Sequence, residues 1–294
     1  MRINKAIILA GGNAKRLYPT TKVTSKHLLN IYNKPMIFYS LSTLMLGGIR
    51  KFLIITSKNQ INNYKKLLGN GKKLGININY AVQKKPRGLP EAFIIAKKFI
   101  NNNPVCLNLG DHIFFGNDVV SLLKKNINNF KKSTIFAYEK KSNNLDYGLI
   151  KFNKFNKPIS VVEKPKQKIS NFIVSGLYIF DQNVYKLCKK LKPSKRNELE
   201  ITDLINCYLD DNSINIEFIN SKNYWIDAGT PEDIIKASNL IYNLENKKNS
   251  YYGYLEIIAY KKGFINLKEF RILIDSYENN QYGSYLFNYL KNYL

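Results

Sequence analysis

The sequence predicts an α/β protein in which a mainly parallel sheet is flanked by helices. Two observations predict this. Short apolar runs alternate with segments of helical periodicity through roughly the first 140 residues, which is typical of βαβ units with right-handed crossovers. The first apolar run also leads directly into Gly11 and Gly12, as expected for a strand followed by a tight turn. The predicted fold is therefore Rossmann-like, with its ligand beyond the carboxyl ends of the strands.

The elements of the first half can be justified in order. Lys5 to Leu9 is an apolar run of strand length. Residues 35–46 carry apolar side chains at helical spacing and stop at Gly47-Gly48. A helix after the turn at residues 86–88 is expected to span 89–99. The expected strands are residues 5–9, 52–56, 76–82, 105–109 and 134–138, and the expected helices are 35–46, a polar helix ending at 68, 89–99 and 117–130.

After residue 143 the pattern changes. Three apolar runs, residues 148–152, 159–163 and 173–180, are expected to form strands that either extend the sheet or form a smaller β subregion over its mouth. Residues 199–210 and 231–244 have helical spacing. Residues 254–294 are helical and aromatic with no strand partner, so we expect a C-terminal helical appendage.

Composition limits the class of protein. The 294 residues allow one sizeable core, and no run of about 18 apolar residues is present. We therefore expect no membrane span. The N-terminal residues lack the apolar core of a signal peptide, and the three cysteines are far apart. These features indicate reduced thiols and a cytoplasmic protein.

The formal net charge of +25 is the unusual feature. Such a charge suits nucleic acid, an acidic membrane surface or a phosphate-rich substrate. The lysines are spread along the chain, however, and accompany abundant Asn, Ile and Tyr. Since neither a clustered basic arm nor an aromatic RNA-binding motif is present, we expect no nucleic-acid partner.

Three short stretches carry residues suited to polyphosphate chemistry. Gly11 and Gly12 let backbone N–H groups approach a phosphate, and Arg16 and Lys26 supply cations just beyond. Asp111 and Asp227 each follow a predicted strand. An acid in that position is either a ligand or a helix N-cap, and two of them together suit Mg²⁺.

An ordered set of motifs resembles the glucose-1-phosphate thymidylyltransferases of the sugar nucleotidyltransferase superfamily. The resemblance runs nearly end to end. It includes Leu9-Ala-Gly-Gly-x-x-x-Arg-Leu-Tyr-Pro19, Ser25-Lys26, Lys34-Pro-Met-Ile37, Ala81-Val-Gln83, Gly88-Leu89, Leu109-Gly-Asp111, Tyr147-Gly148, Val162-Glu-Lys-Pro165, Ser175-Gly-Leu-Tyr178, the stretch from Arg196 to Asp203 and Trp225-Ile-Asp-Ala-Gly-Thr230.

The resemblance implies an activity. It is the Mg²⁺-dependent transfer of a thymidylyl group from dTTP to glucose 1-phosphate, giving dTDP-glucose and pyrophosphate, early in the synthesis of dTDP-rhamnose. It also implies a catalytic domain over residues 1–245, with a nucleotide half of about 1–140 and a sugar half of about 141–245. Residues 246–294 would form a regulatory and oligomerisation segment of a homotetramer.

The resemblance assigns roles to single residues. Arg16, Lys26 and Lys164 would act on the phosphates as catalytic cations, and Asp111 and Asp227 would hold the Mg²⁺. The nucleotide would be bound by Leu9, Gly11, Gly12, Gln83 and Gly88, and the sugar phosphate by Tyr147, Gly148, Glu163, Lys164, Val174 and Arg196. For Gln83, whose amide can pair with the imide edge of thymine, an ordinary surface position on a strand is the alternative.

The sequence departs from the family pattern at several positions. The loop reads Asn13-Ala14-Lys15 where the family has Ser-Gly-Thr, so Ala14 adds a Cβ at a position that favours positive φ. His27 replaces a Gln, and His112 replaces an Asn; neither histidine is assigned a catalytic role. We expect an active enzyme with altered nucleotide affinity.

Two further departures lie in the C-terminal segment. Ile257 and Lys261 stand where the family's regulatory region has Glu and Arg. Lysine lacks the planar fork with which arginine grips a phosphate, so feedback inhibition by dTDP-rhamnose is expected to be weaker.

Other functions stay open at this point. A uridylyl- or cytidylyltransferase on the same fold is one alternative, and an inactive sugar-nucleotide-binding relative is another. A basic nucleic-acid binder rests on the net charge alone.

Overall fold

The computed structural model describes the chain except residues 13, 142–144, 221, 249–250, 278–279 and 294. Its main sheet has nine strands in the order β10-β9-β11-β6-β1-β4-β5, and β8 joins β12 to β11. The strands are β1 (Lys5–Leu9), β4 (Lys51–Thr56), β5 (Asn77–Val82), β6 (Val105–Leu109), β8 (Ser133–Glu139), β9 (Gly148–Phe152), β10 (Pro158–Glu163), β11 (Phe172–Phe180) and β12 (Ile214–Ile219).

The expected α/β fold is confirmed. Strands β5, β4, β1 and β6 are parallel neighbours, which is the βαβ part that the first half of the sequence predicts. Strand β11 then pairs antiparallel with β6, and β8, β9 and β10 continue the antiparallel part. The change of direction at β6–β11 separates the two halves of the sheet.

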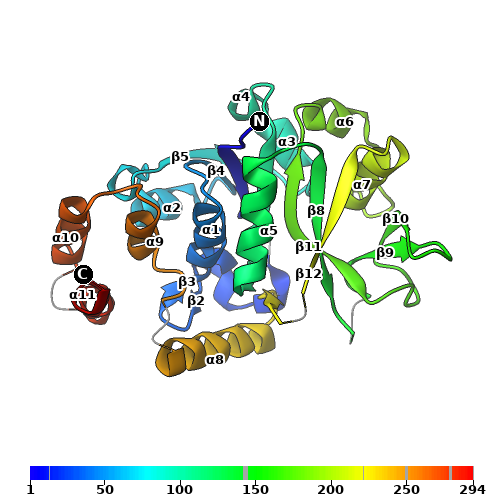
Figure 1. Cartoon of the computed structure of the whole chain (residues 1–294). Coiled ribbons are helices and arrows are strands. Elements are labelled where there is room, and N and C mark those ends of the chain that lie inside the picture. The colour runs from blue at the N-terminus through cyan, green and yellow to red at the C-terminus, as the bar shows by residue number, and fades with distance from the viewer. Residues whose placement is uncertain (13, 142–144, 221, 249–250, 278–279, 294) are drawn as a thin grey trace.

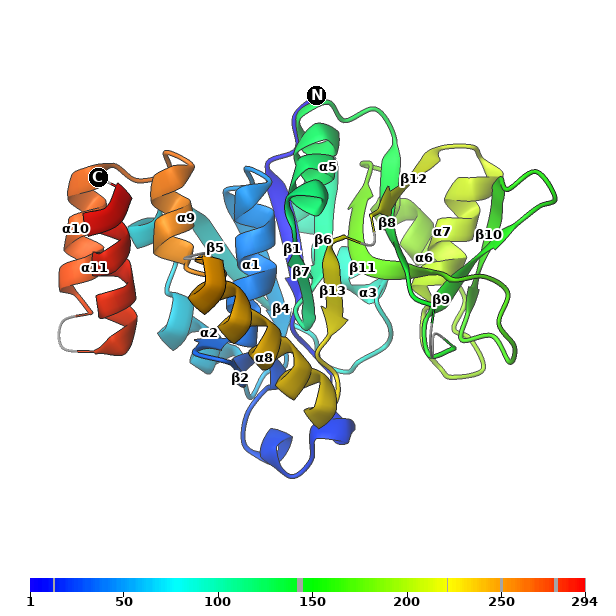
Figure 2. The ribbon, with the colours of Figure 1, turned by 60° about the horizontal axis from the view of Figure 1, so that its bottom comes forward.

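Helices cover both faces of the sheet and extend beyond one end of it (Figures 1 and 2). The α-helices are α1 (Met36–Leu46), α2 (Ile61–Leu68), α3 (Glu91–Ile95), α4 (Lys97–Ile100), α5 (Asn117–Asn128), α6 (Val184–Lys190), α7 (Ile201–Asp210), α8 (Pro231–Lys248), α9 (Leu255–Lys261), α10 (Leu267–Asp275) and α11 (Gln281–Tyr293). Short 3-10 turns occupy Lys15–Leu17, Thr20–Lys22, Lys26–Leu28 and Lys72–Leu74.

The alternation of side chains along β1 divides the core into two layers. Ile8 points to the layer that contains Leu41 of α1 and Leu123 of α5. Ile7, one residue earlier, points to the layer that contains Phe93 of α3 and Leu204 of α7. Because successive strand residues face opposite sides, one short apolar strand holds both helical layers against the sheet.

The C-terminal helices α9, α10 and α11 gather at one end of the molecule, far from β9, β10 and α7 at the other end (Figures 1 and 2). Leu255, Ile257 and Ile258 of α9 are buried in the same layer as α1. The predicted helical appendage over residues 254–294 is therefore confirmed as an arrangement of helices. No helix of the described chain is long and apolar enough to cross a membrane.

The structure differs from the sequence prediction in several elements. The helix expected over residues 89–99 is two short helices, because Ala96 has ψ of 5° and interrupts the helical path. Strand β12 (Ile214–Ile219) was not predicted. Its two end residues are buried, and the residues between them are partly or fully exposed. Helix α6 (Val184–Lys190) was not predicted either. The same holds for β7 (His112–Phe115), which pairs with β13 (Tyr224–Asp227), and for the short strands β2 (Asn30–Ile31) and β3 (Lys34–Pro35), which pair with each other.

Candidate active site

A pocket of about 280 Å³ opens at the carboxyl ends of β1, β5 and β6. This is the edge at which an open α/β sheet places its ligand. The pocket brings together every residue expected to bind the nucleotide, along with Lys26 and Asp111. It is lined by Leu9, Gly11, Gly12, Lys26, His27, Gln83, Pro86, Gly88, Leu89, Leu109, Asp111 and Glu198.

The glycine turn has the backbone geometry that the sequence suggests. Gly12 has φ of 94°, which favours glycine. Ala14 has φ of 42° and ψ of 45°, so it occupies the left-handed region despite its Cβ. Asn13 lies outside the described residues. The carbonyl of Ala14 accepts hydrogen bonds from the Leu17 N–H and the Thr21 hydroxyl, each at 3.0 Å, and these bonds hold the turn in place.

Lys26 and Asp111 form an ion pair inside this pocket. Both side chains are largely buried, with exposed fractions of 16% and 12%. Burial alone would raise the pKa of Asp111, but the positive charge of Lys26 beside it holds that pKa well below its usual range. Asp111 is therefore a carboxylate that carries its negative charge in a largely dry site.

Strand pairing brings Asp227 to Asp111. In the β7–β13 ribbon, Asp227 lies opposite His112, and the Ala228 N–H donates to the Asp111 carbonyl at 3.0 Å. One ligand atom from each of Asp111, His112 and Asp227 lies within 4.8 Å of the others. The two acids are 116 positions apart in sequence numbering, yet this register places them in one cluster.

The alternative role of these acids as helix N-caps does not apply. Asp111 is followed by a strand, β7. Helix α8 begins at Pro231, and Thr230 accepts the hydrogen bond from the Asp233 N–H at 3.2 Å. Neither carboxylate is therefore used as a helix cap.

The chemistry of this cluster fits a divalent cation. In the described part of the chain, Asp227 Oδ1 is buried without a hydrogen-bond partner. Such an oxygen is costly unless something binds it. One or two carboxylates near phosphate are the usual protein ligands of Mg²⁺. The unpaired oxygen and the convergence of both acids therefore suit a cation at this position.

Arg16 approaches the same cluster from the glycine turn. A Cβ added to Gly229 would lie 2.5 Å from Arg16 Nη2 and 2.9 Å from Asp227 Oδ1. Gly229 thus leaves the room in which the guanidinium approaches Asp227. Arg16 itself is exposed, so its charge is available to a ligand that enters the site.

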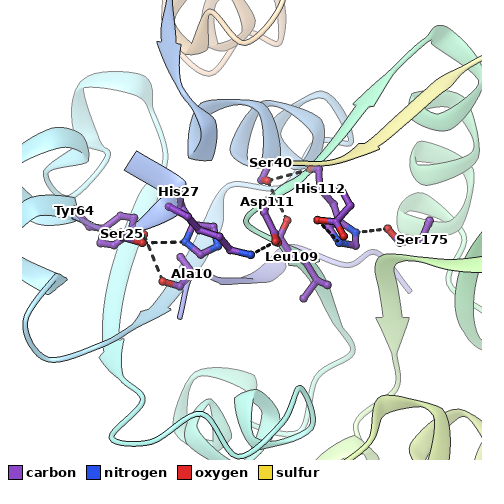
Figure 3. A network of polar contacts seen from close by, with 11 residues as sticks. Ala10, Ser25, His27, Ser40, Tyr64, Leu109, Asp111, His112 and Ser175 are labelled. Atoms are coloured by element: carbon purple, nitrogen blue, oxygen red, sulfur yellow. Dashed lines mark hydrogen bonds and ion pairs between the residues drawn. The ribbon is translucent and has the colours of Figure 1, made fainter. Parts of the chain in front are cut away.

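His112 was given no role from sequence, but its side chain belongs to this cluster. Its Nδ1–H donates to the Ser175 carbonyl at 2.6 Å (Figure 3), and its Nε2 lies 4.0 Å from Asp227 Oδ1. Its position directly after Asp111, in a chain with only two histidines, is the signal that could have identified it.

The second histidine, His27, is a buried neutral residue. Its Nδ1 shares a hydrogen bond with the Ser25 hydroxyl at 3.0 Å, and Ser25 also bonds Tyr64 (Figure 3). Burial, followed by the charge of Lys26, lowers the pKa of His27 to about 3. His27 therefore lines the pocket without carrying charge.

Gln83 is a pocket residue and not an exposed strand residue, because only 6% of it is exposed. Its Nε2 donates to Glu91 Oε2 at 2.8 Å. That bond fixes the orientation of the amide, which leaves Oε1 beside Gly11, where an added Cβ would come within 2.6 Å of it. The glycine therefore keeps space for this amide at the base of the pocket.

The expected sugar-binding residues form a second group in the other half of the molecule. Arg196 binds Glu163 at 3.2 Å and Glu200 at 2.7 Å. Gly148 lies beside Glu163, whose Oε2 would be 3.5 Å from an added Cβ. Val174 is buried in the adjacent sheet layer. Glu163 and Arg196 thus form an ion pair beside Gly148, on the β9–β10 side of the molecule.

Tyr147 and Lys164 connect this second group to the cluster. The ring of Tyr147 packs edge-on against Trp225, with centroids 5.4 Å apart, and burial, followed by the charge of Asp227, raises its pKa. The Lys164 N–H donates to the Tyr147 carbonyl at 3.2 Å. The Lys164 side chain is exposed, and no ion pair links it to Asp111 or Asp227 in the described part of the chain.

Gly88 joins the two groups. It has φ of 102° and forms a bridge with Leu199. An added Cβ would lie 2.0 Å from the Leu199 carbonyl oxygen, so only glycine permits this close approach. The neighbouring Glu198, which sequence reasoning did not single out, consequently reaches the nucleotide-side pocket.

Comparison with known proteins gives consistent matches. The family model for nucleotidyl transferases matches residues 5–243. The glucose-1-phosphate thymidylyltransferase of Neisseria meningitidis serogroup A / serotype 4A is 43% identical over 287 residues, covering 98% of this chain and 99% of that protein. The enzyme of the same name from Xanthomonas campestris pv. campestris strain B100 is 40% identical over 286 residues, covering 97% of each.

Two solved structures are similar in fold. A Bacillus anthracis protein assigned to the glucose-1-phosphate thymidylyltransferases, in complex with sucrose, has a TM-score of 0.73 at 35% identity, covering 80% of this chain and 94% of that one. A UDP-glucose pyrophosphorylase in complex with UDP-glucose has a TM-score of 0.70 at 25% identity, covering 82% and 99%.

Proposed function

Since the chain belongs to the nucleotidyl transferase family, we propose that it is an enzyme that transfers a thymidylyl group from dTTP to glucose 1-phosphate. The products are dTDP-glucose and pyrophosphate. The dTDP-glucose is an activated sugar for deoxysugar synthesis, such as that of dTDP-rhamnose. Relatives with this activity in their names match nearly the whole chain. The observation that carries the proposal is the convergence of Asp111 and Asp227 beside Lys26 and Arg16.

The proposed reaction is an in-line displacement at phosphorus. A phosphate oxygen of glucose 1-phosphate attacks the α-phosphorus of dTTP, and the bond from that phosphorus to the bridging oxygen breaks as pyrophosphate leaves. Both reactants are anionic, so their approach is opposed by repulsion. Catalysis therefore depends on positioning and on fixed positive charge, without a covalent enzyme intermediate.

The cationic side chains would offset that repulsion. Lys26 is held in the pocket by Asp111 and would contact the triphosphate. Arg16 reaches the same place from the glycine turn and would stabilise charge on the departing pyrophosphate. Lys164 would bind the phosphate of the sugar. Asp111 and Asp227 would hold Mg²⁺, which when bound neutralises charge on phosphate oxygens.

The remaining residues would select the substrates. Backbone N–H groups at Gly11 and Gly12 would contact the phosphates, and Leu9 and Gly88 would line the nucleotide. The Gln83 amide, fixed by Glu91, would accept the N3–H of thymine. On the sugar side, Tyr147, Gly148, Glu163, Val174 and Arg196 would surround the hexose.

The division of the chain follows from these roles. We propose a catalytic domain over residues 1–245, whose nucleotide half is about 1–140 and whose sugar half is about 141–245. Its end agrees with the family match to residues 5–243. Residues 246–294 would then contribute to regulation and to the assembly of a homotetramer. We place this enzyme in the cytoplasm, and we expect Ile257 and Lys261 to weaken its feedback inhibition.

A second candidate is a uridylyltransferase. The fold is shared with a UDP-glucose pyrophosphorylase at a TM-score of 0.70, and uracil presents the same imide edge to Gln83 as thymine. The two functions therefore differ in which triphosphate the enzyme uses.

A screen of pyrophosphate release tests both. Purified protein with Mg²⁺ is supplied with dTTP, UTP, CTP or ATP, each with the 1-phosphates of glucose, galactose or N-acetylglucosamine. We expect the highest kcat/KM with dTTP and glucose 1-phosphate. A higher value with UTP would assign the second candidate, and the absence of pyrophosphate in all twelve combinations would refute a sugar nucleotidyltransferase.

A further inference from the structure

We propose that His112 is a third ligand of the cation at Asp111 and Asp227, and that it raises the affinity of this site for first-row transition-metal ions relative to its affinity for Mg²⁺. The inference rests on the divalent-cation site of the proposed function. It adds a nitrogen ligand that the assigned carboxylates do not supply.

The geometry of the three side chains carries the first step. Asp111, His112 and Asp227 each offer one ligand atom, and the three atoms lie within 4.8 Å of one another. His112 Nε2 and Asp227 Oδ1 are 4.0 Å apart. Two ligands at about 2.1 Å from one ion can be separated by up to about 4.2 Å. One cation can therefore contact His112 Nε2 and Asp227 Oδ1, and the Asp111 oxygen has to approach by at most about 0.6 Å to join them.

The hydrogen bonding of the imidazole carries the second step. Since a carbonyl oxygen can only accept, His112 Nδ1 carries the proton of the bond to Ser175 (Figure 3). In the neutral ring, Nε2 is then the nitrogen with a free lone pair, and it is the nitrogen nearer to Asp227. Metal-binding histidines typically have this arrangement, with the other ring nitrogen donating to a backbone carbonyl or carboxylate.

The backbone around Ser175 makes this orientation rigid. The pairing of β11 with β8 shifts register between Val174 and Tyr178, and such an irregularity redirects backbone groups. The Ser175 carbonyl there accepts from both His112 and Trp225 Nε1, at 2.6 and 2.8 Å. Gly176 has φ of 80°, and an added Cβ would lie 2.1 Å from His112 Nδ1. The ring therefore occupies space that the strand leaves for it.

The ligand set determines the type of cation. Mg²⁺ prefers oxygen ligands, whereas imidazole suits the later first-row metals, whose affinities for a given site rise from Mn²⁺ through Co²⁺ to Ni²⁺. A site with two carboxylates and one imidazole would therefore bind Co²⁺ and Mn²⁺ more tightly, relative to Mg²⁺, than the same site without the histidine. Asp227 Oδ1, which has no hydrogen-bond partner in the described chain, is available to the same ion.

The chain offers a direct spectroscopic test because it contains two histidines and one tryptophan. Mn²⁺ is added to the untagged, substrate-free protein, and electron spin echo envelope modulation detects ¹⁴N nuclei coupled to the bound ion. We expect a histidine nitrogen signal in the natural protein. The signal is lost in His112→Asn and kept in His27→Gln, the matched control at the other buried histidine of the site.

Affinity gives an independent measurement. The Trp225 and His112 rings pack edge-on, with centroids 5.2 Å apart, so Co²⁺ in this site quenches Trp225 fluorescence, and Mg²⁺ is measured by competition. His112→Asn is expected to lower the affinity for Co²⁺ relative to that for Mg²⁺ by about 10- to 100-fold, on the scale seen when histidine ligation is disturbed. His27→Gln leaves this ratio unchanged.

These experiments distinguish a failure of the His112 proposal from a failure of the proposed function. An unaltered Co²⁺ to Mg²⁺ ratio in a folded His112→Asn protein, or a Mn²⁺ complex without ¹⁴N coupling, would overturn the role of His112 even if dTDP-glucose is produced. Nitrogen-coupled Mn²⁺ in a protein that releases no pyrophosphate would instead support the ligand and reject the reaction. Equal melting temperatures of the variants show that any loss of binding is local.

Discussion

The structure contains two buried lysine–carboxylate pairs, Lys26–Asp111 and Lys34–Glu245. They differ in whether every buried polar atom around the pair has a hydrogen-bond partner. At the pocket, Lys26 pairs with Asp111, while the nearby Asp227 Oδ1 has no partner in the described chain. At the junction with the C-terminal helices, Lys34 donates to Glu245 at 2.9 Å and to Asn33 at 2.6 Å, and lies 3.8 Å from the centroid of the Tyr254 ring.

At the junction with the C-terminal helices, the buried polar side-chain atoms of the described residues all have hydrogen-bond partners. Lys34 is fully buried, and burial lowers its pKa to about 8 although Glu245 opposes that shift. Nearby Glu256 accepts hydrogen bonds from Tyr277 and Tyr282 at 2.9 and 2.7 Å. A buried polar cluster whose atoms are all hydrogen-bonded stabilises the fold, whereas a cluster with an unpaired carboxylate oxygen can bind a ligand.

The largest effect is expected from breaking the saturated pair. Lys34→Met leaves the Glu245 carboxylate buried without its cation, which typically costs about 3–5 kcal/mol of unfolding free energy. Denaturant unfolding monitored by circular dichroism measures it. Activity at a temperature where the variant is still folded is expected to stay near that of the natural protein.

A double variant is the control for that result. Lys34→Met combined with Glu245→Leu removes both charges, and replacing a buried pair by apolar residues is often nearly neutral. The double variant is therefore expected to be more stable than Lys34→Met alone. If Lys34→Met lowered stability by less than about 1 kcal/mol, the pair would not hold the C-terminal helices in the way the contacts indicate.

The unsaturated site is expected to show the opposite behaviour. Asp227→Asn removes a charge that binds the cation and should lower kcat/KM by about 10²- to 10³-fold, on the scale of about 2.7–4 kcal/mol for a lost electrostatic contact. The melting temperature should not fall, because Asp227 Oδ1 has no partner in the described chain and the amide oxygen of the variant can still accept the hydrogen bond from Tyr147. Steady-state pyrophosphate release and a thermal scan measure the two quantities. A destabilised but active variant would contradict the comparison.

Sequence patterns predicted the parallel half of the fold because its signals are local. The apolar runs of β1, β4, β5 and β6 each occupy a strand, and Gly47 ends α1 as expected. The break at Ala96 was not predictable in this way, since nothing in the residues around it disfavours a helix.

Local sequence patterns predicted the position of the site, whereas only the family resemblance predicted that its two acids converge. Asp111 and Asp227 could be identified because each ends an apolar run. Their convergence depends on the β7–β13 register, a long-range pairing that no local pattern encodes. His112 was missed for the same reason, because its partner Ser175 comes from an irregularity in β11.

The next effect concerns the space between Arg16 and Asp227. Gly229→Ala adds a Cβ that would lie 2.5 Å from Arg16 Nη2 and 2.9 Å from Asp227 Oδ1. Displacing these groups should lower kcat/KM by up to about 100-fold, the cost of a misplacement of about 1 Å, with little change in stability. In an Arg16→Ala background the same substitution should cost much less. Equal losses in both backgrounds would show that the guanidinium is not what the added methyl displaces.

The smallest effect tests the backbone of the glycine turn. Ala14 is held at φ of 42° by two hydrogen bonds to its carbonyl, and a left-handed L-residue costs about 1–2 kcal/mol. Ala14→Gly relieves this strain but loses about 0.4–1 kcal/mol through the more flexible unfolded chain. We therefore expect a net gain of about 0.5 kcal/mol in unfolding free energy, measured by urea denaturation. Ala92→Gly, in the first turn of α3 with ordinary helical geometry, is the control. It should lose more than about 0.5–1 kcal/mol, because the buried methyl group of Ala92 is lost in addition to helix propensity. If both glycine variants were destabilised alike, Ala14 would not be strained, and the turn would accommodate its methyl group as easily as a glycine.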